Sequence, residues 1–324
     1  MNRNYSIDVL RIISAIAVIM IHVVTSPVYN SANVINTSVE NNLELIKDLM
    51  LWSVPVFFMI TGYCLLKKQE CTYKYCFSHV FKYLEVLFSV GLFYSLMEEI
   101  FTAKTINYTL VIKSVLNVIS GNLWDHMWFV YSIIGVYLVM PVIHSFMQQG
   151  AKNVCILTGL LFFFTIFCPA INKWLPIGID FPFGGYLFYV CLGGAIAKCR
   201  IKKELLYFCC LSGGLSIMCM VTVAGTHSFG YRDMLVCLIA MSIFLIVNKI
   251  DIKPNKLILK ISECTWGIYL IHPFFINIAI KLLKIDLLTS LPYVKLSVFA
   301  LIVSIISFIT TYMLRKIPFI KKLF

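Results

Sequence analysis

Charged residues are scarce in this sequence, and acidic residues are the scarcer kind. Only 13% of the 324 residues are Asp, Glu, Lys or Arg, whereas a soluble globular domain has about 25%. Hydrophobic residues make up 60%, and the mean hydropathy is +0.89. There is too little charge to cover a surface that faces water. The composition therefore excludes a soluble domain and indicates a chain that lies largely within a membrane.

Patterns that would indicate other functions are also missing. The first apolar run has no small-residue cleavage pattern, so we interpret it as a retained helix and not as a signal peptide. The twelve cysteines fall mostly within apolar runs, and their spacings match no zinc or redox motif. We find no metal-binding set, phosphate loop or serine nucleophile elbow. The net charge is +12, but the basic residues are spread over many loops, so we expect no nucleic-acid partner.

Ten apolar runs, separated by charges and by Gly, Pro or Asn clusters, divide the chain. A span needs about 20 apolar residues to cross the hydrocarbon core, and within lipid such runs satisfy their backbone only as helices. The sequence predicts an all-α, polytopic membrane bundle of about ten transmembrane helices, one domain over residues 1–324 with no separate soluble domain. The runs lie at about 7–27, 46–66, 83–103, 127–147, 154–171, 184–199, 205–224, 233–248, 264–284 and 294–314.

The positions of Lys and Arg predict an orientation. Cytoplasmic loops carry an excess of these residues, and an even number of spans puts both termini on one side. Placing both termini in the cytoplasm assigns most of the 27 basic residues to the inside. The two longest polar stretches, at about 28–45 and 104–125, are then expected to be outward-facing loops, and loops often carry function.

The first apolar run carries three ionisable residues, Asp8, Arg11 and His22. Such groups within spans are costly and often mark functional sites. Arg11 and His22 are three turns and about 20° apart, so they share one helix face about 16 Å apart along the axis. Asp8 can pair with Arg11 at i,i+3 spacing. We expect Arg11 and His22 to face one channel, although position alone also allows a membrane-border pair and a packing histidine.

More polar residues are expected at the outer depth of His22. Glu98 and Glu99 end the third run, and Asp125 and His126 open the fourth. A histidine with a pKa near its reference value of about 6.5 can accept a proton at neutral pH. His22 and His126 are therefore the candidates for a general base.

Other residues of these runs have simpler explanations. Trp128 and Tyr131 suit an interfacial aromatic belt. His272 precedes Pro273, which lacks a backbone donor, and we interpret His272 as a packing or locally hydrogen-bonded histidine.

Taken together, these residues resemble a known family, the membrane-bound acyltransferase-3 proteins, which O-acylate cell-surface sugars. Arg11 and His22 fit that family's signature of an arginine, ten residues and a histidine in the first helix. The segments 54–66, 126–129 and 267–273 extend the likeness in the family's order over nearly the whole chain. Within the family, the sequence is similar to the O-acetyltransferase of enterobacterial common antigen and to the membrane portion of vancomycin-resistance serine racemases.

The resemblance implies that cytoplasmic acetyl-CoA is the acyl donor, with its phosphates at the basic inner face and its pantetheine arm entering past Arg11. His22 would activate an acceptor hydroxyl or take the acetyl group itself, with His126 as a second catalytic residue. Many relatives carry a basic pair before the third helix, where this chain has His79 and Lys82. The binding residues expected on this basis are Lys82 for the donor and Asp8, Glu98, Glu99, Asp125, Trp128 and Tyr131 for the substrate.

The function expected from the sequence is therefore an O-acetyltransferase of a bacterial inner or plasma membrane. Its partners would be membrane lipid and a surface glycan or lipid-linked sugar, and no metal is expected. The likeness to racemase-linked membrane domains leaves an alternative, a transporter or flippase for a serine-like amino acid or a glycan, in which the charges line a path. We see no inverted repeat. A third possible function is a membrane scaffold, in which the polar residues only hold the helices together.

Overall fold

The computed structural model describes residues 3–31, 36–172, 185–199 and 202–324, and these ranges contain helices and no strand. Two shorter apolar helices, α10 (Gly185–Lys198) and α12 (Met234–Lys249), overlap the predicted runs at 184–199 and 233–248. The predicted all-α, multi-pass bundle is confirmed. Eight helices in the described ranges are long and apolar enough to cross a membrane: Tyr5–Tyr29, Thr37–Leu66, Tyr73–Ala103, Asp125–Gln148, Ala151–Asn172, Lys203–Thr222, Lys256–Leu282 and Pro292–Leu314.

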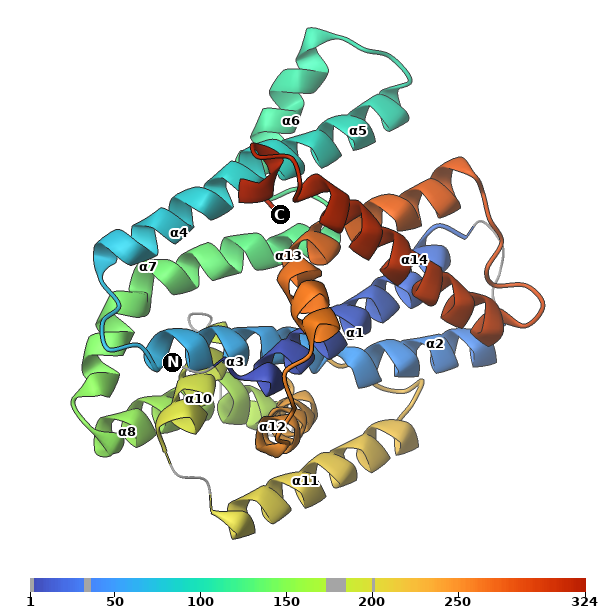
Figure 1. The fold of residues 1–324 in the computed structure, drawn as a ribbon. Helices are drawn as coiled ribbons and strands as arrows, with labels where there is room; N and C mark the ends of the chain where they lie inside the picture. The colour runs from blue at the N-terminus through green and yellow to red at the C-terminus, as the bar shows by residue number, and fades with distance from the viewer. Residues whose placement is uncertain (1–2, 32–35, 173–184, 200–201) are drawn as a thin grey trace.

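The first helix, α1 (Tyr5–Tyr29), lies in the middle of the bundle (Figure 1). It packs against α2 (Thr37–Met50), α3 (Ser53–Leu66), α13 (Lys256–Asn277) and α14 (Pro292–Leu314), and also against α12. Its N-terminus is capped by Asn4, whose side chain accepts a hydrogen bond from the Ser6 amide at 3.0 Å. A continuous helix at the centre can present side chains to both ends of the bundle.

Helices α3 and α10 pack closely together, and glycines allow this spacing. A Cβ atom on Gly62 would lie 1.8 Å from the carbonyl oxygen of Val190, and one on Gly193 would lie 1.9 Å from that of Met59. The two backbones therefore touch, as small residues allow in membrane helices.

The two polar stretches predicted as outer loops both contain helices. In the first, α2 is capped by Asn36, which accepts a hydrogen bond from the Ser38 amide at 2.9 Å. In the second, α6 (Tyr108–Ser120) is capped by Asn107 and ends at Gly121, whose φ of 78° lies in the left-handed region. Neither helix was predicted, because an amphipathic helix does not stand out in a search for long apolar runs.

The third membrane helix begins well before its predicted start at residue 83. It consists of α4 (Tyr73–Val86), the π-helical turn η1 (Leu87–Gly91) and α5 (Leu92–Ala103). Thr72 caps it by accepting a hydrogen bond from the Tyr75 amide at 3.3 Å. The early start places His79 and Lys82 inside this helix and not in a segment that precedes it.

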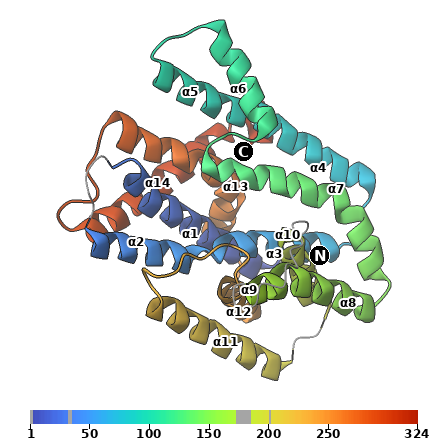
Figure 2. The ribbon, with the colours of Figure 1, turned by 180° about the vertical axis from the view of Figure 1, so that it is seen from behind.

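The remaining helices complete the bundle. Seen from both sides, the α5–α6 hairpin and α11 lie at opposite edges, and α11 packs mainly on α12 (Figure 2). The elements are η2 (Asp125–Met127), α7 (Trp128–Gln148), α8 (Ala151–Phe162), η3 (Phe163–Phe167), α9 (Cys168–Asn172), α11 (Lys203–Thr222), η4 (Ile278–Leu282) and η5 (Ile320–Lys322).

Candidate active site

A cavity of about 330 Å³, called here the Arg11 cavity, opens among α1, α3, α4, α7 and α13. Among the described residues that line it, Arg11 and Lys68 are the only cations, and most of the others are apolar or aromatic. Lys68 was missed by the sequence analysis, which expected Lys82 to contribute the charge. The aromatic lining residues are Phe57, Tyr75, Tyr83, Phe129, Tyr137, Trp266 and Tyr269.

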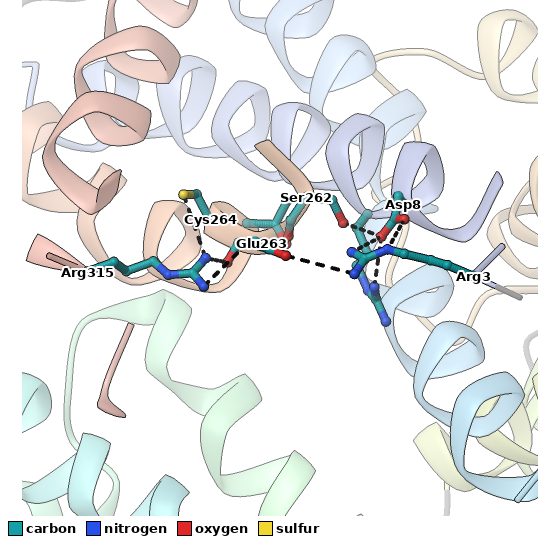
Figure 3. Close-up of polar contacts among 8 residues, drawn as sticks. Arg3, Asp8, Ser262, Glu263, Cys264 and Arg315 are labelled. Atoms are coloured by element: carbon teal, nitrogen blue, oxygen red, sulfur yellow. Dashed lines mark hydrogen bonds and ion pairs between the residues drawn. The ribbon is translucent and has the colours of Figure 1, made fainter. Parts of the chain in front are cut away.

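Asp8 holds Arg11 in place at the edge of this cavity. The Arg11 guanidinium donates to Asp8 Oδ1 at 3.2 Å, as the i,i+3 spacing predicted. Asp8 is 1% exposed and also accepts hydrogen bonds from Arg3 at 2.8 and 3.0 Å and from the Ser262 hydroxyl at 2.6 Å (Figure 3). These contacts occupy its carboxylate, and Asp8 does not line the Arg11 cavity. The structure thus places Asp8 beside Arg11 and not within reach of a ligand there.

The same network continues to α14. Arg3 lies 3.9 Å from the Glu263 carboxylate, and Arg315 pairs with Glu263 at 3.7 Å from the other side (Figure 3). The hydrogen bonds to Asp8 raise the pKa of Arg3 above its ordinary value. The network therefore ties the start of α1 to α13 and α14 and fixes the backbone from which Arg11 projects.

A second cavity of about 410 Å³, called here the His22 cavity, lies at the other end of α1. Five residues that the sequence predicted to lie together do line it: His22, Glu98, Glu99, Asp125 and His126. Its walls are rich in hydrogen-bonding groups. The other polar lining residues are Ser26, Tyr29, Asn30, Ser95, Asn117, Asn122, Trp124 and Asn277.

Two of the carboxylates in the His22 cavity are held by lysines from outside its lining. Glu98 pairs with Lys281 of η4 at 2.8 Å and accepts a hydrogen bond from Trp124 Nε1 at 3.0 Å. Glu99 pairs with Lys113 of α6 at 2.8 Å. These ion pairs fix the positions of the two carboxylates. The pair with Lys113 links α6 to the site.

Three histidines meet at the base of the His22 cavity. The His22 ring centroid lies 5.2 Å from that of His272 and 6.3 Å from that of His126, and the latter two are 5.8 Å apart. His126 and His272 are buried, at 2% and 0% exposure. Within the described residues, no group of His, Cys, Asp and Glu is arranged to hold a metal ion. The sequence predicted a packing or locally hydrogen-bonded histidine at His272, and its Nδ1 does lie 3.1 Å from the Ile268 carbonyl oxygen. Its contacts with His22 and His126 were not predicted.

A layer of rings separates the two cavities. Tyr269 and Phe129 line the Arg11 cavity, and the Tyr269 ring lies 5.7 Å from His126 and 6.2 Å from His272. The Tyr269 hydroxyl donates to the backbone carbonyl of His126. The structure therefore has two cavities where we predicted one channel, because aromatic side chains from α7 and α13 fill the middle of the bundle. Arg11 and His22 still lie on one helix.

Besides Asp8, three further predicted site residues line neither cavity. Trp128 packs against Tyr186 and Tyr231, with ring centroids 5.1 and 5.4 Å away. The Tyr131 hydroxyl donates to the Val118 carbonyl at 2.5 Å, which ties α7 to α6. Lys82 is exposed on α4. The structure does not bring these side chains to the site.

The chain matches the family profile described as an acyltransferase domain over residues 4–312. This chain belongs to the acyltransferase-3 family. It is a multi-pass membrane acyltransferase. The match spans the helices that carry Arg11, His22, His126 and His272.

Two curated relatives resemble this acyltransferase. It is 27% identical to an amino-acid racemase of Enterococcus faecalis over 98% of this chain and 48% of that protein, so the chain spans about half the length of that relative. It is 22% identical to YfiQ of Bacillus subtilis (strain 168), named as a membrane-bound acyltransferase, over 86% of this chain and 82% of that protein. No solved structure matches the chain.

Proposed function

We propose that this protein moves an acetyl group from cytoplasmic acetyl-CoA to a hydroxyl of an extracytoplasmic glycan or lipid-linked sugar. One observation carries the proposal: a single continuous helix presents Arg11 to one cavity and His22 to another. The rise of an α-helix separates the two residues by about 16 Å. A donor and an acceptor that approach from opposite sides of a bilayer need this arrangement.

The Arg11 cavity suits the donor arm. A guanidinium offers several donors in a planar fork that fits phosphate or carbonyl oxygens, and Lys68 adds a second positive charge. The apolar and aromatic walls exclude water, which protects a thioester from hydrolysis. Val18 lines this cavity and precedes His22 by one helical turn, about 6 Å along the axis. A donor that fills the cavity therefore ends close to the base.

The His22 cavity suits a sugar. Its amides, carboxylates and hydroxyls can pair with the hydroxyls of a glycan, which an apolar pocket would leave unsatisfied. The charged groups that line it, Glu98, Glu99 and Asp125, are acidic.

The chemistry follows from these positions. His22 takes the proton of the acceptor hydroxyl while the hydroxyl oxygen attacks the thioester carbonyl carbon. The C–S bond then breaks, and the sulfur of CoA leaves with the proton from His22. In the second route a ring nitrogen of His22 attacks the thioester carbonyl carbon, and the C–S bond breaks as CoA leaves. The acceptor hydroxyl then attacks the acetyl group on His22, and the proton of the hydroxyl ends on the sulfur of CoA. In either route the acetyl group crosses the ring layer, which a rotation of Phe129 would open.

Comparison of surface glycans from cells with and without the protein tests the proposal. The glycans from cells that have it should be heavier by one acetyl mass at one sugar in mass spectrometry. The purified protein in proteoliposomes should release free CoA thiol from acetyl-CoA when the acceptor is present. Identical glycans with no thiol release would exclude the proposal, and uptake of radiolabelled serine without thioester chemistry would favour the transporter.

Substitution of Asp8 by asparagine is expected to weaken donor use. Asp8→Asn keeps the shape of the side chain but removes the charge that fixes Arg11. A hydrogen bond to a charged group contributes about 1.5–3 kcal/mol, so we expect KM for acetyl-CoA to rise about 10-fold or more. Steady-state kinetics at varied acetyl-CoA concentration measures this change.

Glu263→Gln is the matched control for that variant. Glu263 belongs to the same network and contacts Arg3 and Arg315, but it makes no ion pair with Arg11. Its KM for acetyl-CoA should stay within about two-fold of the wild-type value, since exposed pairs contribute little. Equal effects of the two substitutions would show that the network stabilises the fold without positioning Arg11.

A further inference from the structure

His272 has a defined tautomer and an unused acceptor. Its Nδ1 lies 3.1 Å from the carbonyl oxygen of Ile268, one turn earlier in α13. Because a carbonyl oxygen only accepts, Nδ1 carries the hydrogen of the neutral ring. Nε2 then carries an accepting lone pair. This buried atom has no hydrogen-bond partner among the described residues. Such an orphan acceptor is costly to bury, and it needs an explanation.

The donor that could reach Nε2 is His22. Each ring nitrogen lies about 1.2 Å from its ring centroid, and the two centroids are 5.2 Å apart, so a rotation of the His22 ring would bring two nitrogens to about 3 Å, a hydrogen-bond distance that the two rings do not reach in the structure. His126 is less suited to this role, since its ring is 6.3 Å from His22 and neither of its nitrogens has a partner among the described residues to fix its tautomer. Of these two histidines, His272 is the one that lies closer to His22 and has its tautomer fixed by a hydrogen bond.

We propose that His272 is a positioning residue that accepts a hydrogen bond from His22 and thereby sets the tautomer of the base. One nitrogen of His22 then carries the hydrogen that points to His272 Nε2. The other nitrogen has no hydrogen, and its lone pair faces the His22 cavity and the acceptor hydroxyl. This inference rests on the proposed function.

The proton balance is simple. When His22 takes the hydroxyl proton it becomes an imidazolium, and its hydrogen bond to His272 becomes charge-assisted and stronger. His272 gains and loses no proton, and the proton leaves with the sulfur of CoA. A carboxylate has this supporting role in Ser-His-Asp sites. A neutral imidazole can replace it within a membrane bundle, where an unpaired carboxylate would be more costly to bury.

The backbone that carries His272 is held from two sides. The Tyr94 hydroxyl of α5 donates to the Leu270 carbonyl at 2.7 Å. The hydroxyl of Tyr269, also on α13, donates to the His126 carbonyl in η2. A positioning residue needs such a rigid support, because small displacements reduce the rate strongly.

Two substitutions test the proposal in the full-length protein, reconstituted in lipid nanodiscs. His272→Leu removes the acceptor and leaves a side chain that packs. His272→Gln keeps an amide N–H for the Ile268 carbonyl and an oxygen that can accept from His22. Acetyl-CoA is varied, and cell envelope from cells that lack the protein supplies the acceptor. We expect kcat of His272→Leu to fall about 100-fold or more with KM for acetyl-CoA unchanged, and His272→Gln to recover at least about 10-fold of that loss.

A structural role predicts a different result. It would lower the melting temperature and the amount of folded protein in both variants, and kcat per folded molecule would stay at the wild-type value. Wild-type kcat in His272→Leu, or no recovery in His272→Gln, would overturn the proposal. Failure of the wild-type protein itself to transfer acetyl would instead refute the proposed function, so the two failures are distinguishable.

Discussion

Replacement of His22 by alanine is expected to abolish acetyl transfer while the protein still accumulates in the membrane. His22 is the histidine of α1 that lines the His22 cavity, and in our proposal it takes the proton of the attacking hydroxyl. Loss of a general base lowers the rate about 10²–10⁴-fold, and loss of an acetylated intermediate would lower it as much. Release of CoA thiol by the purified variant and the acetyl content of surface glycans both measure the effect.

His227→Ala is the control for this experiment. It is the same substitution at an exposed histidine between α11 and α12, where the ring contacts Phe229 and lines neither cavity. Transfer by this variant should equal that of the wild type. If His22→Ala also transferred acetyl at the wild-type rate, both the catalytic role of His22 and the inference about His272 would fail.

Alanine at Gly62 or Gly193 is expected to remove most of the folded protein. A single methyl group at either position would fall on a carbonyl oxygen of the facing helix, at 1.8 or 1.9 Å. Because that oxygen belongs to the backbone, α3 and α10 must move apart to make room, and the core around Phe58 and Tyr189 loses its packing. Overpacking of a core costs about 1–3 kcal/mol and occasionally more, and we expect these sites to reach the upper end.

Alanine at Gly135 and Gly214 gives the matched controls. Both glycines lie within helices, α7 and α11, and a Cβ atom there meets nothing within 4 Å. These variants should show wild-type yield and melting temperature by size-exclusion chromatography and thermal unfolding in detergent. Stable Gly62→Ala and Gly193→Ala proteins would mean that the two helices are not in backbone contact.

Much of the site could be predicted because its signals are local. The eleven-residue interval from Arg11 to His22 fixes one face of a helix, and the helix is continuous over both. Glu98, Asp125 and His126 were predicted to lie at the depth of His22, and they line its cavity. The depth of a residue in the bilayer follows from its position along its own span, so this prediction did not require knowing which helices pack together.

Other features depend on contacts between helices and could not be predicted in this way. Which face of α13 turns inward decides whether His272 lies beside His22 or faces lipid, and an apolar run around it does not contain that information. The same holds for Lys68, which follows the end of α3 and lines the Arg11 cavity, whereas Lys82, within α4, is exposed.

The amino-acid sequence by itself determined that this chain is a helical membrane protein and that its first helix carries a cation and a base on one face. Both follow from hydropathy and from the period of one helix, which each segment has before it packs. Only the tertiary structure decided that two cavities replace a single channel and that three histidines meet between them. Those features arise where side chains from α1, η2, α7 and α13 fill a shared space, and the filling depends on which helices are neighbours.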